Sequence, residues 1–96
     1  MKFSIYHLSI ENNNVFRGYE ESKFDFTAYD KVYAGEIPGE YSYKYIDVIL
    51  GTLYEDFNIR RPEDYKNRSM SVSDIIYLEK HGFFFCDSFG WKQLSL

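Results

Sequence analysis

Alternation of apolar and polar positions predicts a β-strand near the beginning of the chain. Within residues 2–10, Phe3 and Ile5 fall on one side and Tyr6 and Leu8 fall on the other. Successive side chains of a strand point to opposite faces of a sheet, so this segment would be apolar on both faces. We therefore expect a strand here that lies inside a sheet and not at its edge.

A helical pattern occupies the middle of the chain. Apolar residues recur at the spacing of one helix face, at Ile46, Ile49, Leu50, Leu53 and Phe57. Ser42 is a suitable N-cap for this helix. Gly51 lies inside it and costs roughly 1 kcal/mol relative to alanine, so we expect it where the helix packs closely on a sheet.

Shorter segments predict further strands at 30–37, 75–78, 83–87 and 91–96. The segment 75–78 is also compatible with a short helix capped by Ser73, but the β-branched and aromatic residues around it favour a strand. Residues 15–39 carry scattered aromatic residues before the second strand and predict an irregular stretch with a helical turn near 20–24. We expect one α+β domain over residues 1–96, with one main amphipathic helix on one face of a mixed or antiparallel sheet of four to five strands.

Composition and charge restrict the possible partners. The chain has 96 residues, 21% of them aromatic, and a net charge of −4. Direct binding to a nucleic-acid backbone needs clustered positive charge, so a basic protein is the better partner. The single cysteine, Cys86, excludes an internal disulfide and fits a reducing cytoplasm. No segment has the length and apolarity of a membrane span, so we expect a cytoplasmic protein.

The reactive side chains do not form a known catalytic or metal-binding pattern. His7 and His81 are far apart in the sequence, and the spacing of zinc ligands is absent. Cys86 lies in a predicted buried strand beside Asp87, where burial would keep the thiol protonated and inert. We expect neither a metal, nor a cofactor, nor an enzymatic activity.

Acidic residues are concentrated between Glu11 and Glu40, where the net charge of −4 equals that of the whole chain. One interpretation is a solvated loop face. The other is a surface that binds a basic partner through carboxylates and aromatic rings. The candidate partner-binding residues are Tyr19, Glu20, Glu21, Phe24, Asp25, Asp30, Glu36 and Glu40.

Short polar residues form a second candidate group around the C-terminal strands, at Ser71, Ser73, Asp74, Asp87 and Ser88. Such side chains bind nearby backbone N–H groups in turns, which is the interpretation we favour. The alternative is a ligand pocket, or a nuclease or hydrolase site using Asp74, Asp87 and Ser88.

These short polar motifs also carry a family resemblance. The run from Tyr54 to Ile76, with Ser-x-Ser-Asp at 71–74, and the Cys-Asp-Ser-x-Gly block at 86–90 resemble the YodL-like domain family, and the resemblance covers most of the chain. It implies a domain of Gram-positive bacteria that is often carried by conjugative elements and phages. It brings no enzymatic activity, and one type of member is associated with disturbing the bacterial actin cytoskeleton.

A small, mildly acidic domain of this kind also resembles anti-CRISPR inhibitors of Cas9. This second resemblance implies a protein partner, Cas9 in its free or guide-loaded form, and a block of guide RNA loading or of DNA access. The alternatives are a modulator of the bacterial actin-like cytoskeleton and an accessory interaction module. The sequence leaves open whether the protein is a monomer or a homodimer.

Overall fold

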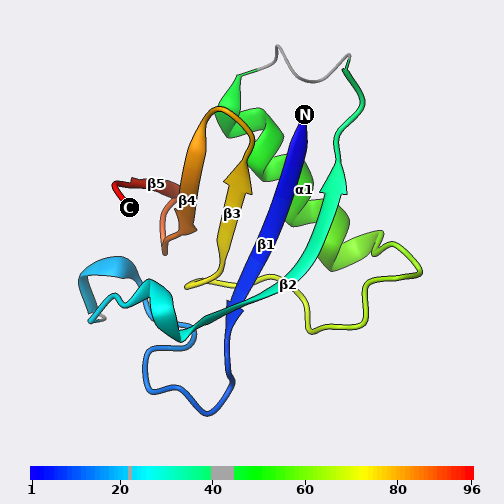
Figure 1. The fold of residues 1–96 in the computed structure, drawn as a ribbon. Helices are drawn as coiled ribbons and strands as arrows, with labels where there is room; N and C mark the ends of the chain where they lie inside the picture. The colour runs from blue at the N-terminus through cyan, green and yellow to red at the C-terminus, as the bar shows by residue number, and fades with distance from the viewer. Residues whose placement is uncertain (22, 40–44) are drawn as a thin grey trace.

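A five-stranded antiparallel sheet forms the centre of the molecule, in the order β2-β1-β3-β4-β5. The computed structural model describes residues 1–21, 23–39 and 45–96. The strands are β1 (Lys2–Leu8), β2 (Tyr29–Glu36), β3 (Ile75–Leu78), β4 (Gly82–Cys86) and β5 (Trp91–Leu94). Within these residues one α-helix, α1 (Ile46–Ile59), crosses one face of the sheet (Figure 1). The predicted α+β class is confirmed.

The predicted interior position of the first strand is confirmed. Phe3 of β1 pairs with Gly35 of β2 on one side and with Leu78 of β3 on the other. The strand ends at Leu8, two residues earlier than expected, because a turn begins at Ser9, whose carbonyl accepts the Asn12 N–H at 2.9 Å.

Helix α1 buries the predicted apolar stripe against the sheet. Ile49, Leu50, Leu53 and Phe57 are buried, and Ile46 is half-buried. The predicted N-cap, Ser42, lies outside the described residues. No helix in the described part of the chain is long and apolar enough to span a membrane.

The expectation for Gly51 is wrong. Gly51 is exposed, and a Cβ built on it would meet no atom within 4 Å. Successive helical residues are rotated by about 100°, so Gly51 lies outside the face on which the preceding Leu50 is buried. Close packing therefore does not account for a glycine at this position.

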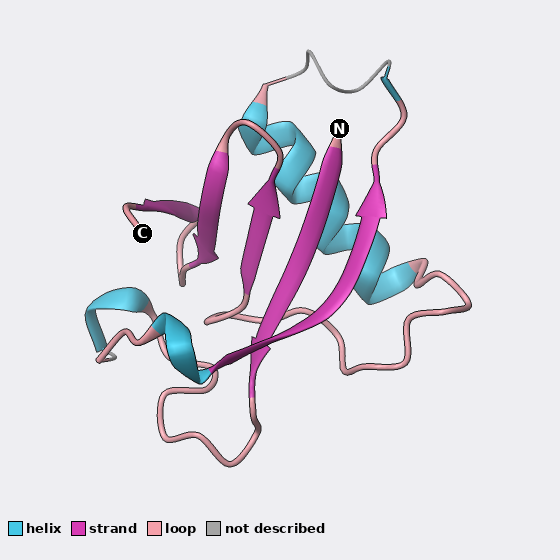
Figure 2. Cartoon of the chain, viewed as in Figure 1, coloured by secondary structure: helices cyan, strands magenta, loops and turns pink. Residues whose placement is uncertain are grey.

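Aromatic residues cover part of the opposite face of the sheet. The irregular segment before β2 forms two short 3-10 helices, η1 (Tyr19–Glu21) and η2 (Phe26–Ala28), instead of one helical turn at 20–24. Figure 2 shows both short helices near the end of the sheet at which β2 begins. The ring of Phe26 packs on Phe83 at a centroid distance of 5.2 Å, and that of Tyr19 packs on Phe85 at 5.4 Å.

The segment 75–78 is a strand, as preferred, and it pairs with both β1 and β4. The alternative, a short helix at 75–78 capped by Ser73, is wrong. The backbone of Ser73 is left-handed, with φ of 85°, which redirects the chain into β3. The turn into β4 uses positive φ at Lys80 and at Gly82.

Two glycines should respond in opposite directions to alanine. Gly51→Ala should stabilise the protein by about 1 kcal/mol, because the exposed helical position has room for the methyl group. Gly35→Ala should destabilise it by about 1–3 kcal/mol, because the new Cβ would lie 2.9 Å from the ring of the buried Phe3. Urea unfolding of both variants measures these changes, and equal effects would contradict the packing described here.

Candidate functional site

A buried ion pair lies where the loop after α1 returns to the sheet. Asp74 is 0% exposed, immediately before β3. Its Oδ1 accepts the Arg68 Nη2 at 2.8 Å, and its Oδ2 accepts the Arg68 Nη1 at 3.0 Å. The Ser71 N–H donates to the same Oδ2 at 2.7 Å. Both carboxylate oxygens are therefore occupied by protein donors.

A histidine and a tyrosine extend this pair into a cluster. His7 of β1 is 5% exposed, and its Nε2 lies 3.3 Å from the Asp74 Oδ2. The Tyr65 hydroxyl lies 3.3 Å from the same nitrogen and donates to the Arg68 carbonyl at 2.6 Å. The Phe16 ring covers the Arg68 guanidinium at 5.2 Å. We call Asp74, Arg68, His7 and Tyr65 the polar cluster.

Burial sets the protonation states in and beside the polar cluster. It lowers the pKa of His7 to about 4, with Arg68 adding to the effect. It raises the pKa of Asp74 to about 6, although Arg68 opposes this rise. It also raises the pKa of Cys86 to about 12, with the Asp74 and Asp87 charges contributing. At neutral pH the cluster thus holds a carboxylate and a neutral imidazole beside an unreactive thiol.

Two of the predicted turn residues, Ser73 and Asp87, bind the segment before β2 and the first residue of β2. The Ser73 Oγ accepts the Phe16 N–H at 3.0 Å, and the Ser73 carbonyl accepts the Tyr29 hydroxyl at 2.6 Å. Asp87 Oδ1 accepts the Tyr19 N–H at 3.2 Å. These contacts join residues that are 44 to 68 positions apart in the sequence.

The residues of the enzyme alternative do not share a cavity. Ser88 is exposed and donates its N–H to Asp87 Oδ1 at 2.8 Å, while Asp74 is buried beside Arg68. Asp74, Asp87 and Ser88 do not line the β2–α1 cavity or the cavity beside Phe24 and Tyr29. Within those residues no group of three or more His, Cys, Asp or Glu side chains could hold a metal ion.

The structure separates the candidate partner-binding residues. Glu20, Asp25 and Asp30 are exposed at the end of the sheet where β2 begins, whereas Glu36 is exposed at the other end of β2. Six residues of strand correspond to roughly 20 Å. Asp25 also caps η2, and its hydrogen bonds from Thr27 lower the pKa of its carboxyl.

The remaining candidates have mixed positions. Tyr19 and Phe24 are half-buried, because their rings pack on each other and on Phe85. Glu21 ends η1, and Glu40 lies outside the described residues. The candidates therefore do not form one face, and a binding role for them stays a prediction.

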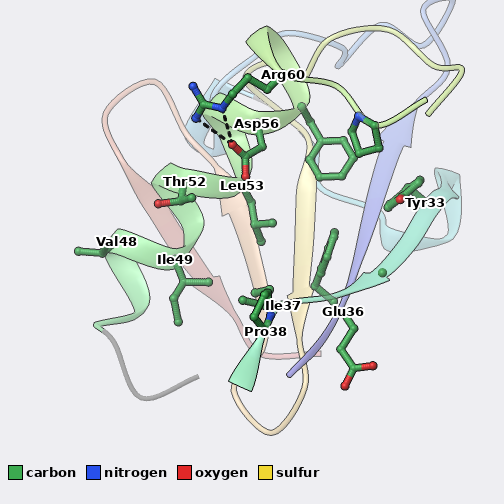
Figure 3. Close-up of a pocket in the computed structure, with 14 residues that line it drawn as sticks. Tyr33, Glu36, Ile37, Pro38, Val48, Ile49, Thr52, Leu53, Asp56 and Arg60 are labelled. Atoms are coloured by element: carbon green, nitrogen blue, oxygen red, sulfur yellow. Dashed lines mark hydrogen bonds and ion pairs between the residues drawn. The ribbon is translucent and has the colours of Figure 1, made fainter. Parts of the chain in front are cut away.

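A groove of about 580 Å³ lies between β2 and α1 (Figure 3). Tyr33 and Ile37 line it from the sheet side, and Val48 and Leu53 line it from the helix. The Arg60–Asp56 ion pair lies at one end of the groove. We call this space the β2–α1 groove.

Sequence reasoning missed both the polar cluster and the groove. From the sequence, His7 was considered only as a metal ligand, and Arg68 was not a candidate. One signal was present, because His7 shares the apolar face of Phe3 and Ile5 and needs a buried polar partner there. The identity of that partner depends on how the loop folds back.

The architecture defines a small α+β domain in which one helix packs on a five-stranded antiparallel sheet. The model of the YodL-like domain matches residues 2–96, so the chain belongs to the YodL-like domain family. No curated protein and no solved structure matches the chain.

Removing Arg68 should destabilise the protein much more than removing an exposed arginine. Arg68→Ala leaves the buried Asp74 carboxylate without its cation, which should cost about 3–5 kcal/mol. The control is Arg60→Ala, whose ion pair with Asp56 lies on the surface and should contribute about 0–1 kcal/mol. Urea unfolding compares the two variants, and equal losses would contradict a structural role for the cluster.

Titration of His7 and titration of Asp74 should change the free energy of unfolding in opposite directions. The folded pKa of His7, about 4, is below its ordinary 6.5, so its contribution to stability is lost as pH falls from 6.5 to 4. The folded pKa of Asp74, about 6, is above its ordinary 3.8, so its contribution is lost as pH rises through 6. Each contribution is on the order of 3 kcal/mol, and they have opposite signs in the same window.

We therefore expect little change in the free energy of unfolding across this window. Urea unfolding at several pH values measures it, and an NMR titration of the His7 ring tests the lowered pKa directly. A His7 midpoint near 6.5 would show that the ring is not held neutral.

Proposed function

We propose that this protein is a non-catalytic inhibitor that acts in the bacterial cytoplasm by binding another protein. We further propose that it comes from a mobile genetic element such as a phage, and that its partner is Cas9. Binding would block guide RNA loading or DNA access. The protein itself would not contact nucleic acid directly.

The placement of polar groups carries the binding part of the proposal. Asp74 and His7 are buried and hydrogen-bonded to other protein groups, so they serve the fold. The solvent-facing features are of a different kind: exposed carboxylates near the start of β2 and an apolar groove at the other end. Such features suit contact with a protein surface.

Charge favours a basic target. The net charge is −4, and Glu20 and Asp30 are exposed. Cas9 holds its guide and target in positively charged channels. Complementary charge would speed association with such a surface, and apolar contacts would slow dissociation.

A second candidate is a modulator of the bacterial actin-like cytoskeleton, which would need an apolar contact surface. Several large apolar side chains are well exposed, among them Val48 at 55%, Ile59 at 72% and Phe89 at 97%. This function predicts a change of cell shape in a strain without any CRISPR system.

The first test is a pull-down of Cas9 with the purified protein, with and without guide RNA, together with a DNA-cleavage assay. We expect binding and loss of cleavage. Preference for guide-free Cas9 would assign the block to guide loading, and preference for the loaded form would assign it to DNA access. Absence of both binding and inhibition with several Cas9 orthologues would reject Cas9 as the partner.

Charge reversal tests the acidic residues near the start of β2. Replacing Glu20 and Asp30 together by lysine should slow association with Cas9 by about tenfold or more at low salt and reduce its salt dependence. Glu63→Lys is the control, because this exposed acid lies in the loop after α1. Equal effects of the double variant and the control would contradict a specific role for this end of the sheet.

A further inference from the structure

The outer edge of β2 exposes backbone groups at two residues. Met1 and Ile37 exchange hydrogen bonds in both directions, at 2.7 and 3.1 Å. Bonded and non-bonded pairs alternate along an antiparallel ladder. Because Ala34 and Glu36 pair with Ser4 and Lys2, at non-bonded positions, their N–H and C=O groups point away from β1.

A neighbouring residue limits further pairing at each end of this stretch. The Val32 carbonyl accepts a hydrogen bond from Asn67 Nδ2 at 3.2 Å, beside the bulge in β2. At the other end Pro38 has no N–H to donate. Between these two limits, the outward N–H and C=O groups of Ala34 and Glu36 have room for about four hydrogen bonds.

The open stretch borders the β2–α1 groove. Side chains of a strand alternate, so Gly35 faces α1 together with Tyr33 and Ile37. Gly35 has no side chain, and the Phe3 ring lies 2.9 Å from the position that its Cβ would take. Figure 3 shows Val48, Ile49 and Leu53 on the helix side of this space. An added strand would place the side chain opposite Gly35 in the groove.

Charge at the open stretch selects the partner further. Glu36 is exposed, and Figure 3 shows its side chain directed away from α1. Arg60, which lines the opposite end of the groove in Figure 3, is already paired with Asp56 at 2.9 Å. A residue opposite Glu36 on an added strand would lie beside its carboxylate, where lysine or arginine is favoured.

We propose that the edge of β2 at Ala34–Glu36 and the β2–α1 groove bind an extended segment of a partner protein. In this segment apolar residues alternate with polar ones, and a lysine or arginine lies opposite Glu36. The proposal rests on the proposed function in that it gives the chemistry of the bound partner. Its test does not depend on Cas9.

The test selects random peptides of about twelve residues, displayed on phage, against the full chain. We expect enriched peptides with alternating apolar residues and a lysine or arginine between them. In NMR spectra these peptides should shift the amide signals of Ala34 and Glu36 and slow their hydrogen exchange.

A proline substitution on each edge strand gives a matched comparison. Ala34→Pro removes one outward N–H and should weaken peptide binding by about tenfold or more. On β5 the outward N–H belongs to Gln93. The backbone of Cys86 bonds towards β3, so that of the preceding Phe85 bonds towards β5, where its partner is Lys92. Because bonded and non-bonded pairs alternate, the N–H of the next residue, Gln93, points away from β4. Gln93→Pro removes that N–H and should leave binding unchanged.

A groove variant covers the case in which Ala34→Pro fails to fold. Val48→Arg replaces an exposed helix residue and places a positive charge in the groove, so it should also weaken binding about tenfold. Circular dichroism confirms the fold of each variant. Failure to enrich any peptide, or full binding to both Ala34→Pro and Val48→Arg, would overturn the proposal.

Two further outcomes separate this proposal from its alternatives. Dimerisation of the free chain that Ala34→Pro abolishes would assign the edge to a second copy and overturn a partner segment. Cas9 binding that survives both variants would leave the inhibitor function standing but remove this surface as its site. Peptide binding that requires Ala34, without any Cas9 binding, would support the surface and reject Cas9.

Discussion

The buried pairing of Asp74 with Arg68 is the constraint on which the other contacts depend. A carboxylate with 0% exposure is stable only when its charge is matched and its oxygens accept hydrogen bonds. Meeting this requirement draws the loop after α1 across β1 and fixes the direction in which the chain enters β3. The neighbouring Ser73 adopts its left-handed backbone at this point and holds the segment before β2.

Aromatic rings supply much of the remaining cohesion on both faces of the sheet. Beneath α1, Phe57 packs on Tyr65 at 4.9 Å, while on the opposite face Tyr77 packs on Phe83 at 4.8 Å. A domain of this size buries a modest fraction of its surface, and large side chains raise the apolar area buried per residue. The high aromatic content is thus explained mainly by packing, with half-buried rings on the face opposite α1.

The period of apolar residues predicted the strands and α1, because within a short segment this period depends on which faces of the element are buried. The segment before β2 was predicted poorly, since its two 3-10 helices are held by Ser73 and Asp87 from distant parts of the chain. The polar cluster has the same origin: His7 and Asp74 are 67 positions apart, and their proximity follows from strand order. Acidic composition alone did not predict that Asp30 and Glu36 lie at opposite ends of β2.

The interior position of β1 in the sheet has a consequence for how the chain folds. β1 pairs with β3, whose partner residues, such as Ile76 for Ile5, come about seventy positions later. This topology implies a high contact order. Folding is slowed because a long loop has to close before these contacts form. On the ribosome, β1 can pair with β3 only after most of the chain has emerged. Until then its apolar faces stay available to chaperones or to neighbouring nascent chains.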